Sequence, residues 1–244
     1  MEQAVGESVD LKTRGVRVVI SVPDGGTAAG AARRTANGRP AVLGGISSLG
    51  TAGIVRPFST ASWRAGVERA VAVMAAREER TLVLCAGSGT EKGARRLLPQ
   101  LPEVCFVEAG DFTGAALRGA VEHGVTQVVF VGTAGRLARL ASGVLTTHYT
   151  RSKADTDLLA EITRTMGGPD ELAARVAEAG AVPHAYELWE GAGLLGRAGR
   201  ELCRRVAEVV ERLTTEAGRT IAAQVVLVDP TGQRMIAMYG RLSR

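Results

Sequence analysis

Short runs of β-branched and aliphatic residues alternate with longer amphipathic segments along most of the chain, and this alternation restricts the fold more than any other feature. Such a pattern is typical of an α/β protein in which helices flank a largely parallel sheet. We therefore predict a Rossmann-like α/β fold. The predicted strands are residues 16–22, 41–46, 81–86, 104–108, 127–131 and 224–228.

The segments between these strands carry apolar residues at helical spacing. Trp63, Val67 and Met74 share one such stripe, and the run MGGPD at 166–170 separates two predicted helices. The tail VVLVDPTGQRMIAMYG at 225–240 reads as two strands joined by a Pro-Thr-Gly turn. The sheet should therefore end with an antiparallel strand pair.

A chain of 244 residues can bury a substantial core, and we expect one domain over 1–244 with a small helical subregion over 152–220. No apolar run is long enough to span a membrane, and the first residues do not resemble a signal peptide, so a cytoplasmic protein is expected. The three cysteines are far apart and match no zinc pattern, which favours reduced thiols and no metal site.

The formal charge of +5 indicates a surface that favours anionic ligands. Nucleic acid is not the expected partner, because aromatic residues make up only 4% of the chain and basic residues form no long run. A small polycarboxylate or phosphate ligand fits this composition better.

Three glycine-rich loops each follow an apolar strand, where open α/β sheets place their ligands. The first, GGISSLGTAGIVRP at 44–57, combines glycines with hydroxyl groups and a guanidinium group. A tight structural turn is the alternative interpretation. The ligand-binding candidates in this loop are Gly45, Ser47, Gly50, Thr51 and Arg56.

The second loop, in TLVLCAGSGTEKGARRLL at 81–98, resembles a nucleotide-binding turn. Its glycines Gly87, Gly89 and Gly93 precede or open a predicted helix, and Glu108 stands near the end of the next strand, where an acidic group accepts ribose hydroxyls. The spacing is looser than that of the dinucleotide fingerprint, and a structural turn explains it nearly as well.

The third loop follows the strand at 127–131 and places Arg136 at the start of a helix, with Thr147 and His148 beyond its end. Between the second and third loops, Asp111 precedes another helix, and we expect it to be that helix's N-cap unless it faces a ligand. A capping or surface role is the alternative for His148.

Taken together, the segments ISVPDG (20–25), VLGGISSLGTAGIVRPFS (42–59), GDFTGAAL (110–117) and GTAGRLARLASGVLTTH (132–148) resemble the cobalt-precorrin-5B C(1)-methyltransferase family of cobalamin biosynthesis. Departures occur at Thr133, Arg136 and Thr146, where the family has His, Lys and Asn. The family also has an amino-terminal domain with a Thr-Gly-rich motif that this chain does not match. We therefore expect that domain to be absent here, and either a separate chain or a longer protein to supply it.

The resemblance implies transfer of a methyl group from S-adenosylmethionine to C1 of cobalt-precorrin-5B, giving cobalt-precorrin-6A. It makes the loop from Gly87 to Gly93, with Glu108, the predicted site of the methyl donor. Carboxylates of the tetrapyrrole are expected to meet Arg56, Lys92, Arg136 and His148, with the rest of the first loop and Asp111 as further substrate-binding candidates. The candidates for a catalytic role are Thr147 and His148. Cobalt belongs to the substrate, so no metal ligand is expected.

Two alternatives remain open at this point. A nicotinamide-dependent oxidoreductase would also use a glycine-rich turn and an acidic residue. A noncatalytic half that binds corrinoid or donor would require a separate amino-terminal domain for turnover. The sequence is compatible with a homo-oligomer but does not predict the number of subunits.

Overall fold

The structure, a computed structural model, describes Arg17 and residues 60–143 and 153–240. The chain divides into two compact units, Met1–Thr51 and Ala52–Arg244, and all the described helices and strands belong to the second. The predicted strands at 16–22 and 41–46 lie outside the described residues. The single domain expected over 1–244 stays a prediction.

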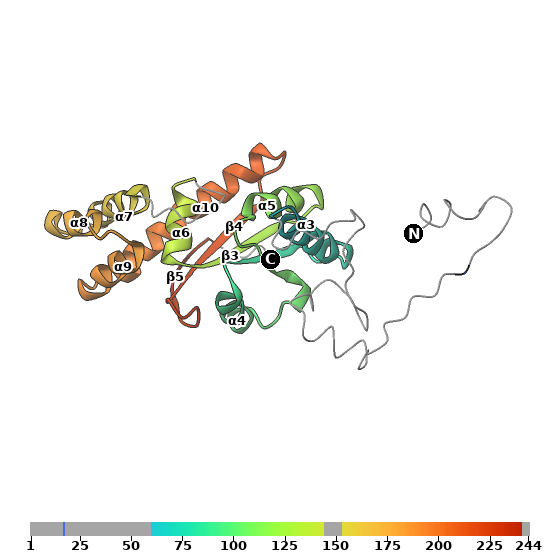
Figure 1. The fold of residues 1–244 in the computed structure, drawn as a ribbon, viewed down its shortest axis with the longest axis horizontal. Helices are drawn as coiled ribbons and strands as arrows, with labels where there is room; N and C mark the ends of the chain where they lie inside the picture. Colours follow the sequence, from blue (N-terminus) through green and yellow to red (C-terminus); the bar gives the residue numbers. More distant parts are fainter. Residues whose placement is uncertain (1–16, 18–59, 144–152, 241–244) are drawn as a thin grey trace. The chain divides into compact units, whose positions relative to one another are not determined.

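The second unit contains a five-stranded sheet with the strand order β2-β1-β3-β4-β5 (Figure 1). The first four strands run parallel, and β5 pairs with β4 in the antiparallel direction. This arrangement confirms the predicted α/β fold with a terminal antiparallel pair. The strands are β1 (Thr81–Cys85), β2 (Phe106–Glu108), β3 (Gln127–Thr133), β4 (Ala222–Val228) and β5 (Met235–Tyr239).

Helices cover both faces of the sheet. In Figure 1, α4 lies on one side, while α3, α5 and α10 lie on the other. Three further helices, α7, α8 and α9, pack against one another beyond α6. The helices are α3 (Thr60–Ala76), α4 (Ser88–Leu97), α5 (Thr113–Glu122), α6 (Ala134–Ala141), α7 (Lys153–Thr165), α8 (Asp170–Ala177), α9 (Val182–Gly191) and α10 (Leu195–Glu216).

Two element boundaries follow from local backbone chemistry. The predicted strand at 104–108 is shorter in the structure, because a 3-10 turn occupies Glu103–Cys105 before β2 begins. Pro102 starts this turn with φ fixed near −60°, and its carbonyl accepts a hydrogen bond from Cys105 N at 3.0 Å. The predicted break at 166–170 is confirmed, with Gly167 in the left-handed region at φ +78°.

Two buried polar side chains of the core, Gln127 and Trp189, make hydrogen bonds that join separate elements. The amide of Gln127, at the start of β3, donates to the carbonyl of Ala222 at 3.2 Å, beside the start of β4. The indole nitrogen of Trp189 in α9 donates to Thr163 Oγ1 in α7 at 2.8 Å. Because unpaired buried polar groups are costly, these bonds help to fix how the elements pack.

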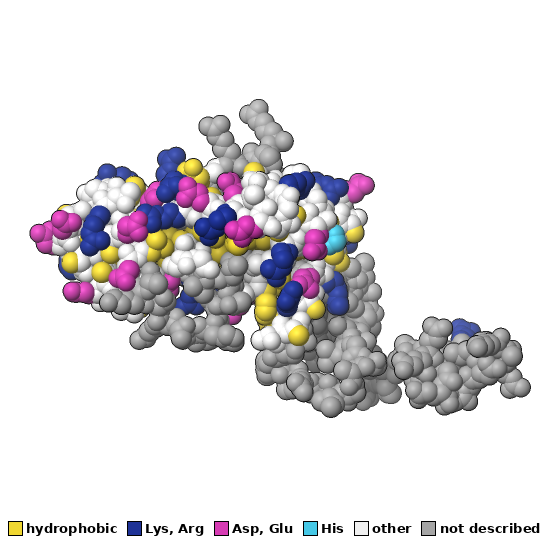
Figure 2. Space-filling model, turned by 90° about the horizontal axis from the view of Figure 1, so that it is seen from above, with side chains coloured by type: hydrophobic (Ala, Val, Ile, Leu, Met, Phe, Trp, Pro, Cys, Tyr) yellow, Lys and Arg dark blue, Asp and Glu magenta, His cyan; other side chains and the backbone are white. Residues whose placement is uncertain are grey.

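An ion-pair network on α10 links this helix to α7. Arg205 contacts both Glu161 of α7 at 2.9 Å and Glu201 of α10 at 3.1 Å, and Arg204 contacts Glu201 at 2.7 Å. On the molecular face seen in Figure 2, basic and acidic side chains likewise lie interspersed. The hydrogen bond from Arg204 lowers the pKa of Glu201 below its ordinary value, although burial works in the opposite direction.

We expect Glu201→Gln to lower the free energy of unfolding at pH 7 by about 1 to 3 kcal/mol, since the carboxylate is largely buried between two arginines. A carboxyl with a lowered pKa in the folded state binds fewer protons there, so its stabilisation is complete above its ordinary pKa of 4.5 and disappears as the pH falls through the lower folded value. Urea unfolding of wild type and variant from pH 7 to pH 3 measures this difference.

The matched control is Glu208→Gln, because Glu208 also pairs with Arg204 but its side chain is 61% exposed. Its effect should stay below about 0.5 kcal/mol at every pH. A difference between wild type and Glu201→Gln that does not shrink in acid would contradict the assigned role of this carboxylate.

Candidate functional site

The carboxyl ends of β1, β2 and β3 lie at one edge of the sheet. Cys85 at the end of β1 pairs with Glu108 on one side and with Val131 on the other. The loops that carry Gly87 and Asp111 therefore begin at nearly the same level, and Arg136 lies in the first turn of α6, which directly follows β3. Of the three predicted ligand segments, the described parts of the second and the third therefore lie at this edge, together with Asp111.

The strand order makes this edge a topological switch point. After β1 the chain moves to β2 at one side of the sheet, and then returns across β1 to form β3 on its other side. The connecting helices α4 and α5 lie on opposite faces (Figure 1). In open α/β sheets, ligands bind in the crevice outside the carboxyl ends of the strands at such a reversal.

Gly87 keeps open the space in front of Glu108. A Cβ atom at position 87 would lie 3.9 Å from Glu108 Oε1, and the Glu108 side chain is half-buried. Thr90, a residue that the sequence analysis did not single out, fixes this turn. Its buried hydroxyl donates to the carbonyl of Gly87 at 2.7 Å and accepts from Gly87 N at 2.9 Å. The sequence signal that could have identified Thr90 is a threonine three residues after Gly87 in a glycine-rich turn, where its hydroxyl can bond to the backbone.

Gly89 and Gly93 contact the turn between β4 and β5. A Cβ atom at position 93 would lie 2.0 Å from the carbonyl oxygen of Gly232, and one at position 89 would lie 3.6 Å from the carbonyl oxygen of Thr231. Gly232 itself adopts φ +74° against Gly89. These glycines therefore let α4 pack closely on the turn, and their predicted role in donor binding stays a prediction.

Asp229 organises that turn. Its carboxylate accepts hydrogen bonds from Gln233 N at 2.8 Å, Arg234 N at 3.1 Å and the hydroxyl of Thr231 at 2.9 Å. Burial works to raise the pKa of Asp229, but the backbone donors of Arg234 and Gln233 outweigh it and lower the pKa. The turn is thus a fixed support for the amino-terminal half of α4.

An ion pair joins the loop that follows β2 to the first turn of α6. Asp111 Oδ1 lies 2.8 Å from Arg136 Nη1, with both side chains more than a third exposed. The expectation that Asp111 caps α5 is wrong, because Phe112 occupies the N-cap and makes no side-chain capping bond. The guanidinium group of Arg136 draws the carboxylate away from the helix end. Lys92 is exposed on α4.

Seven of the predicted site residues lie outside the described residues, so their assigned roles stay predictions. They are Gly45, Ser47, Gly50, Thr51, Arg56, Thr147 and His148.

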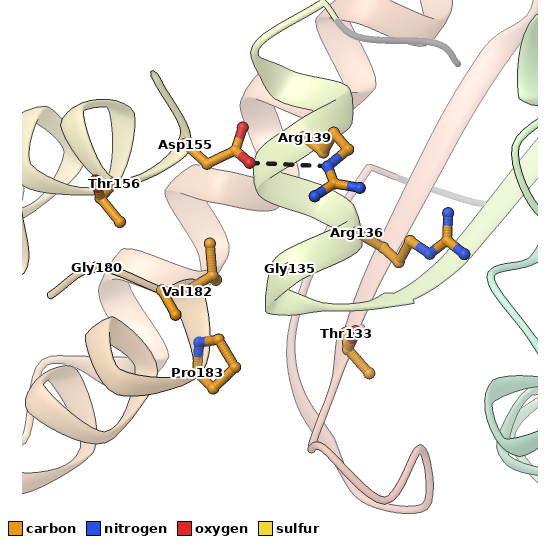
Figure 3. A pocket seen from close by; sticks show the side chains of 10 residues that line it. Thr133, Gly135, Arg136, Arg139, Asp155, Thr156, Gly180, Val182 and Pro183 are labelled. Atoms are coloured by element: carbon orange, nitrogen blue, oxygen red, sulfur yellow. Dashed lines mark ion pairs between the residues drawn. The ribbon is translucent and has the colours of Figure 1, made fainter. Parts of the chain in front are cut away.

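A pocket of about 300 Å³ lies beside the amino-terminal end of α6 (Figure 3). Arg139 points from α6 toward Asp155 at the start of α7, and its Nε lies 3.8 Å from Asp155 Oδ2. The sequence analysis assigned no ligand to Arg139 or Asp155. The lining residues are Thr133, Gly135, Arg136, Arg139, Asp155, Thr156, Gly180, Ala181, Val182 and Pro183.

The three cysteines are buried thiols that form no disulfide bond. Burial raises the pKa of Cys203 to about 12, and burial with the nearby Glu79 raises that of Cys105 to about 12. In the described part of the chain, no group of three or more His, Cys, Asp or Glu side chains is placed to hold a metal ion. None of the helices described there is long and apolar enough to cross a membrane.

Comparison with known proteins gives two family matches and several similar sequences. Residues 1–57 match the family described as CbiD, and residues 146–237 match CbiD, C-terminal domain. A protein of Salinispora arenicola named cobalt-precorrin-5B C(1)-methyltransferase is 60% identical over 99% of this chain. Proteins of the same name from Salinispora tropica and Rubrobacter xylanophilus are 58% and 55% identical over 99% and 91% of the chain.

The chain spans 62% of the length of the two Salinispora proteins and 56% of the Rubrobacter protein. No solved structure matches it.

Proposed function

We propose that this chain, which matches CbiD family models over residues 1–57 and 146–237, takes part in the methylation of cobalt-precorrin-5B at C1. The observation that carries the proposal is the 60% identity, over 99% of the chain, with a relative that bears the name of this activity. Sequences this similar share a fold and, as a rule, the residues that line its site. The cytoplasmic location expected from the sequence is part of the same proposal.

The proposed methyl donor is S-adenosylmethionine, whose sulfonium group supplies an electrophilic methyl when it is bound. The residues at the switch point fit an adenosyl group. Glu108 stands at the carboxyl end of β2, next to the reversal in strand order, where an acidic side chain can accept hydrogen bonds from ribose hydroxyls. Gly87 leaves the space before that carboxylate open, since any larger side chain would extend toward it.

The remaining residues of the edge would orient the tetrapyrrole. Asp111, in the loop after β2, pairs with the guanidinium group of Arg136 in the first turn of α6. Arg136 can then bind a substrate carboxylate through its planar fork of donors. Methyl transfer to carbon requires alignment and exclusion of water more than proton transfer. We therefore assign Arg136 and Glu108 to positioning of the reactants, with Thr147 and His148 as the proposed catalytic candidates.

Glu108→Gln tests the donor assignment. The variant should bind S-adenosylmethionine about tenfold more weakly in isothermal titration calorimetry, because hydrogen bonds to a charged acceptor contribute roughly 1.5 to 3 kcal/mol. The control is Glu122→Gln, at the exposed end of α5, which should bind like wild type. Equal donor affinity in wild type and Glu108→Gln would remove Glu108 from the proposed site.

Transfer of an isotopically labelled methyl group to cobalt-precorrin-5B, followed by mass spectrometry, tests the function itself. We expect labelled product from the chain, alone or with the remainder of a related enzyme added as a separate chain. Donor binding without product in either case would indicate a noncatalytic binding half.

Fluorescence titration with NADH tests the alternative that the protein is a nicotinamide-dependent oxidoreductase. That alternative requires saturable binding of NADH.

A further inference from the structure

We propose that the pocket beside α6 binds a carboxylate group, and that it receives one acidic side arm of the tetrapyrrole. The second half of this inference rests on the proposed function. The first half concerns only the chemistry of the pocket.

Three separate segments build this pocket. The amino-terminal half of α6 forms one wall, the first turn of α7 forms another, and residues 180–183 leading into α9 form the third (Figure 3). A volume of about 300 Å³ is at the lower end of the range for ligand sites. It suits a small group or one arm of a larger ligand.

The charges of the lining residues favour a monoanion. Arg136 and Arg139 are cationic, and Asp155 is the acidic member of the lining. Asp111, which pairs with Arg136, does not line the pocket. Together the two arginines and the two carboxylates balance in charge, so an anion would be held by guanidinium N–H donors rather than by net charge. Next to Asp155, a singly charged carboxylate meets less repulsion than a dianionic phosphate.

Asp155 positions Arg139 within the pocket. The Asp155 side chain is only 4% exposed, and its Oδ1 accepts a hydrogen bond from Ser142 Oγ at 3.2 Å. Its Oδ2 lies 3.8 Å from Arg139 Nε, close enough for attraction but longer than a hydrogen bond. The buried carboxylate thus directs the guanidinium group toward the pocket. A guanidinium group offers five donors, so it can contact Asp155 and a ligand together.

The shape and location of the pocket also suit a substrate arm. Ala181, Val182 and Pro183 supply an apolar wall for methylene groups next to the polar lining. Arg136 lines the pocket and also reaches Asp111 at the switch-point edge. A ligand that lies over this edge can therefore extend a carboxylated arm past Arg136 to Arg139.

Two corrinoid probes that differ in their side arms test the proposal. Dicyanocobyrinic acid carries free carboxylates, and dicyanocobinamide carries amides in their place. We expect Arg139→Gln to weaken binding of the acid at least about tenfold in titration calorimetry and to change binding of the amide less than twofold. The control is Arg164→Gln, since Arg164 on α7 is 55% exposed and does not line the pocket. Its two affinities should equal those of wild type.

A second variant fills the pocket without removing a charge. A Cβ atom at Gly135 would meet no atom within 4 Å, so Gly135→Ala should fold with at least wild-type stability, and Gly135→Leu starts from the same open position. Its side chain would occupy space next to Arg139 and should weaken binding of the acid probe at least about fivefold, whereas Gly135→Ala should have a smaller effect. Circular dichroism and thermal unfolding verify the fold of each variant.

The outcomes separate the two proposals. Loss of acid binding in both folded variants supports the pocket, even if wild type shows no methyl transfer, in which case the proposed function alone would be wrong. Wild-type affinity for the acid in folded Arg139→Gln and Gly135→Leu would overturn the pocket, even if methyl transfer is normal. Equal losses for acid and amide would also overturn it, because the site would then not recognise a carboxylate.

Discussion

Gly93→Ala should lower the free energy of unfolding by about 3 kcal/mol or more, a large fraction of the stability of a domain this size. The added Cβ atom would lie 2.0 Å from the backbone oxygen of Gly232, so α4 or the turn between β4 and β5 must move. Backbone contacts between Gly232 and Gly89 leave the turn little freedom to do so. Chemical unfolding followed by circular dichroism measures the effect.

Gly66→Ala is the matched control. This glycine is also within a helix, α3, but a Cβ atom there would have no neighbour within 4 Å. Helix propensity should make this variant about 0.5 to 1 kcal/mol more stable than wild type. If Gly93→Ala were as stable as Gly66→Ala, the claim that α4 packs too closely on the turn to admit a Cβ atom at position 93 would be wrong.

Arg136→Gln should reduce kcat/KM for methyl transfer to the tetrapyrrole by roughly 10- to 100-fold, with little change in donor affinity. This range corresponds to the loss of charge-assisted hydrogen bonds to a carboxylate. Asp111→Asn should reduce kcat/KM less, because the guanidinium group remains and loses only its orientation. The double variant should resemble Arg136→Gln, since the effects of residues in one ion pair are not additive.

A steady-state assay with varied tetrapyrrole at saturating donor distinguishes these cases. Arg136→Lys provides the conservative comparison, and we expect partial activity because it retains the charge but not the planar fork. Wild-type kcat/KM in Arg136→Gln would exclude this residue from substrate binding.

Much of the fold could be predicted from the sequence because its strands are short, apolar and separated by helix-forming segments. The strand at 127–131 and the terminal pair around Asp229 and Gly232 have clear local signals. The order β2-β1-β3-β4-β5 was not predicted, since it depends on which crossover helix covers which face. That Gly87, Asp111 and Arg136 lie at one edge could be predicted, because parallel strands end at a common edge, while the ligands of these residues stay predictions.

Other parts of the site depend on contacts between residues that are distant in the sequence. Gly93 has the spacing of a ligand glycine, and its contact with Gly232 appears only when the tail folds back beside α4. Asp111 stands where an N-cap is expected, but an arginine 25 residues later attracts its carboxylate. The pocket at Arg139 forms only because α7 and residues 180–183 pack beside α6, and no sequence motif predicts these contacts.

A crystal structure of the chain with S-adenosylhomocysteine would test the central claim most directly. The account predicts that the nucleoside binds outside the carboxyl ends of β1 and β2. Its ribose hydroxyls should donate hydrogen bonds to Glu108, and the nucleoside should lie beside Gly87. Density for the nucleoside at another surface, with the Glu108 carboxylate making no contact to it, would contradict the assignment of this edge to the methyl donor.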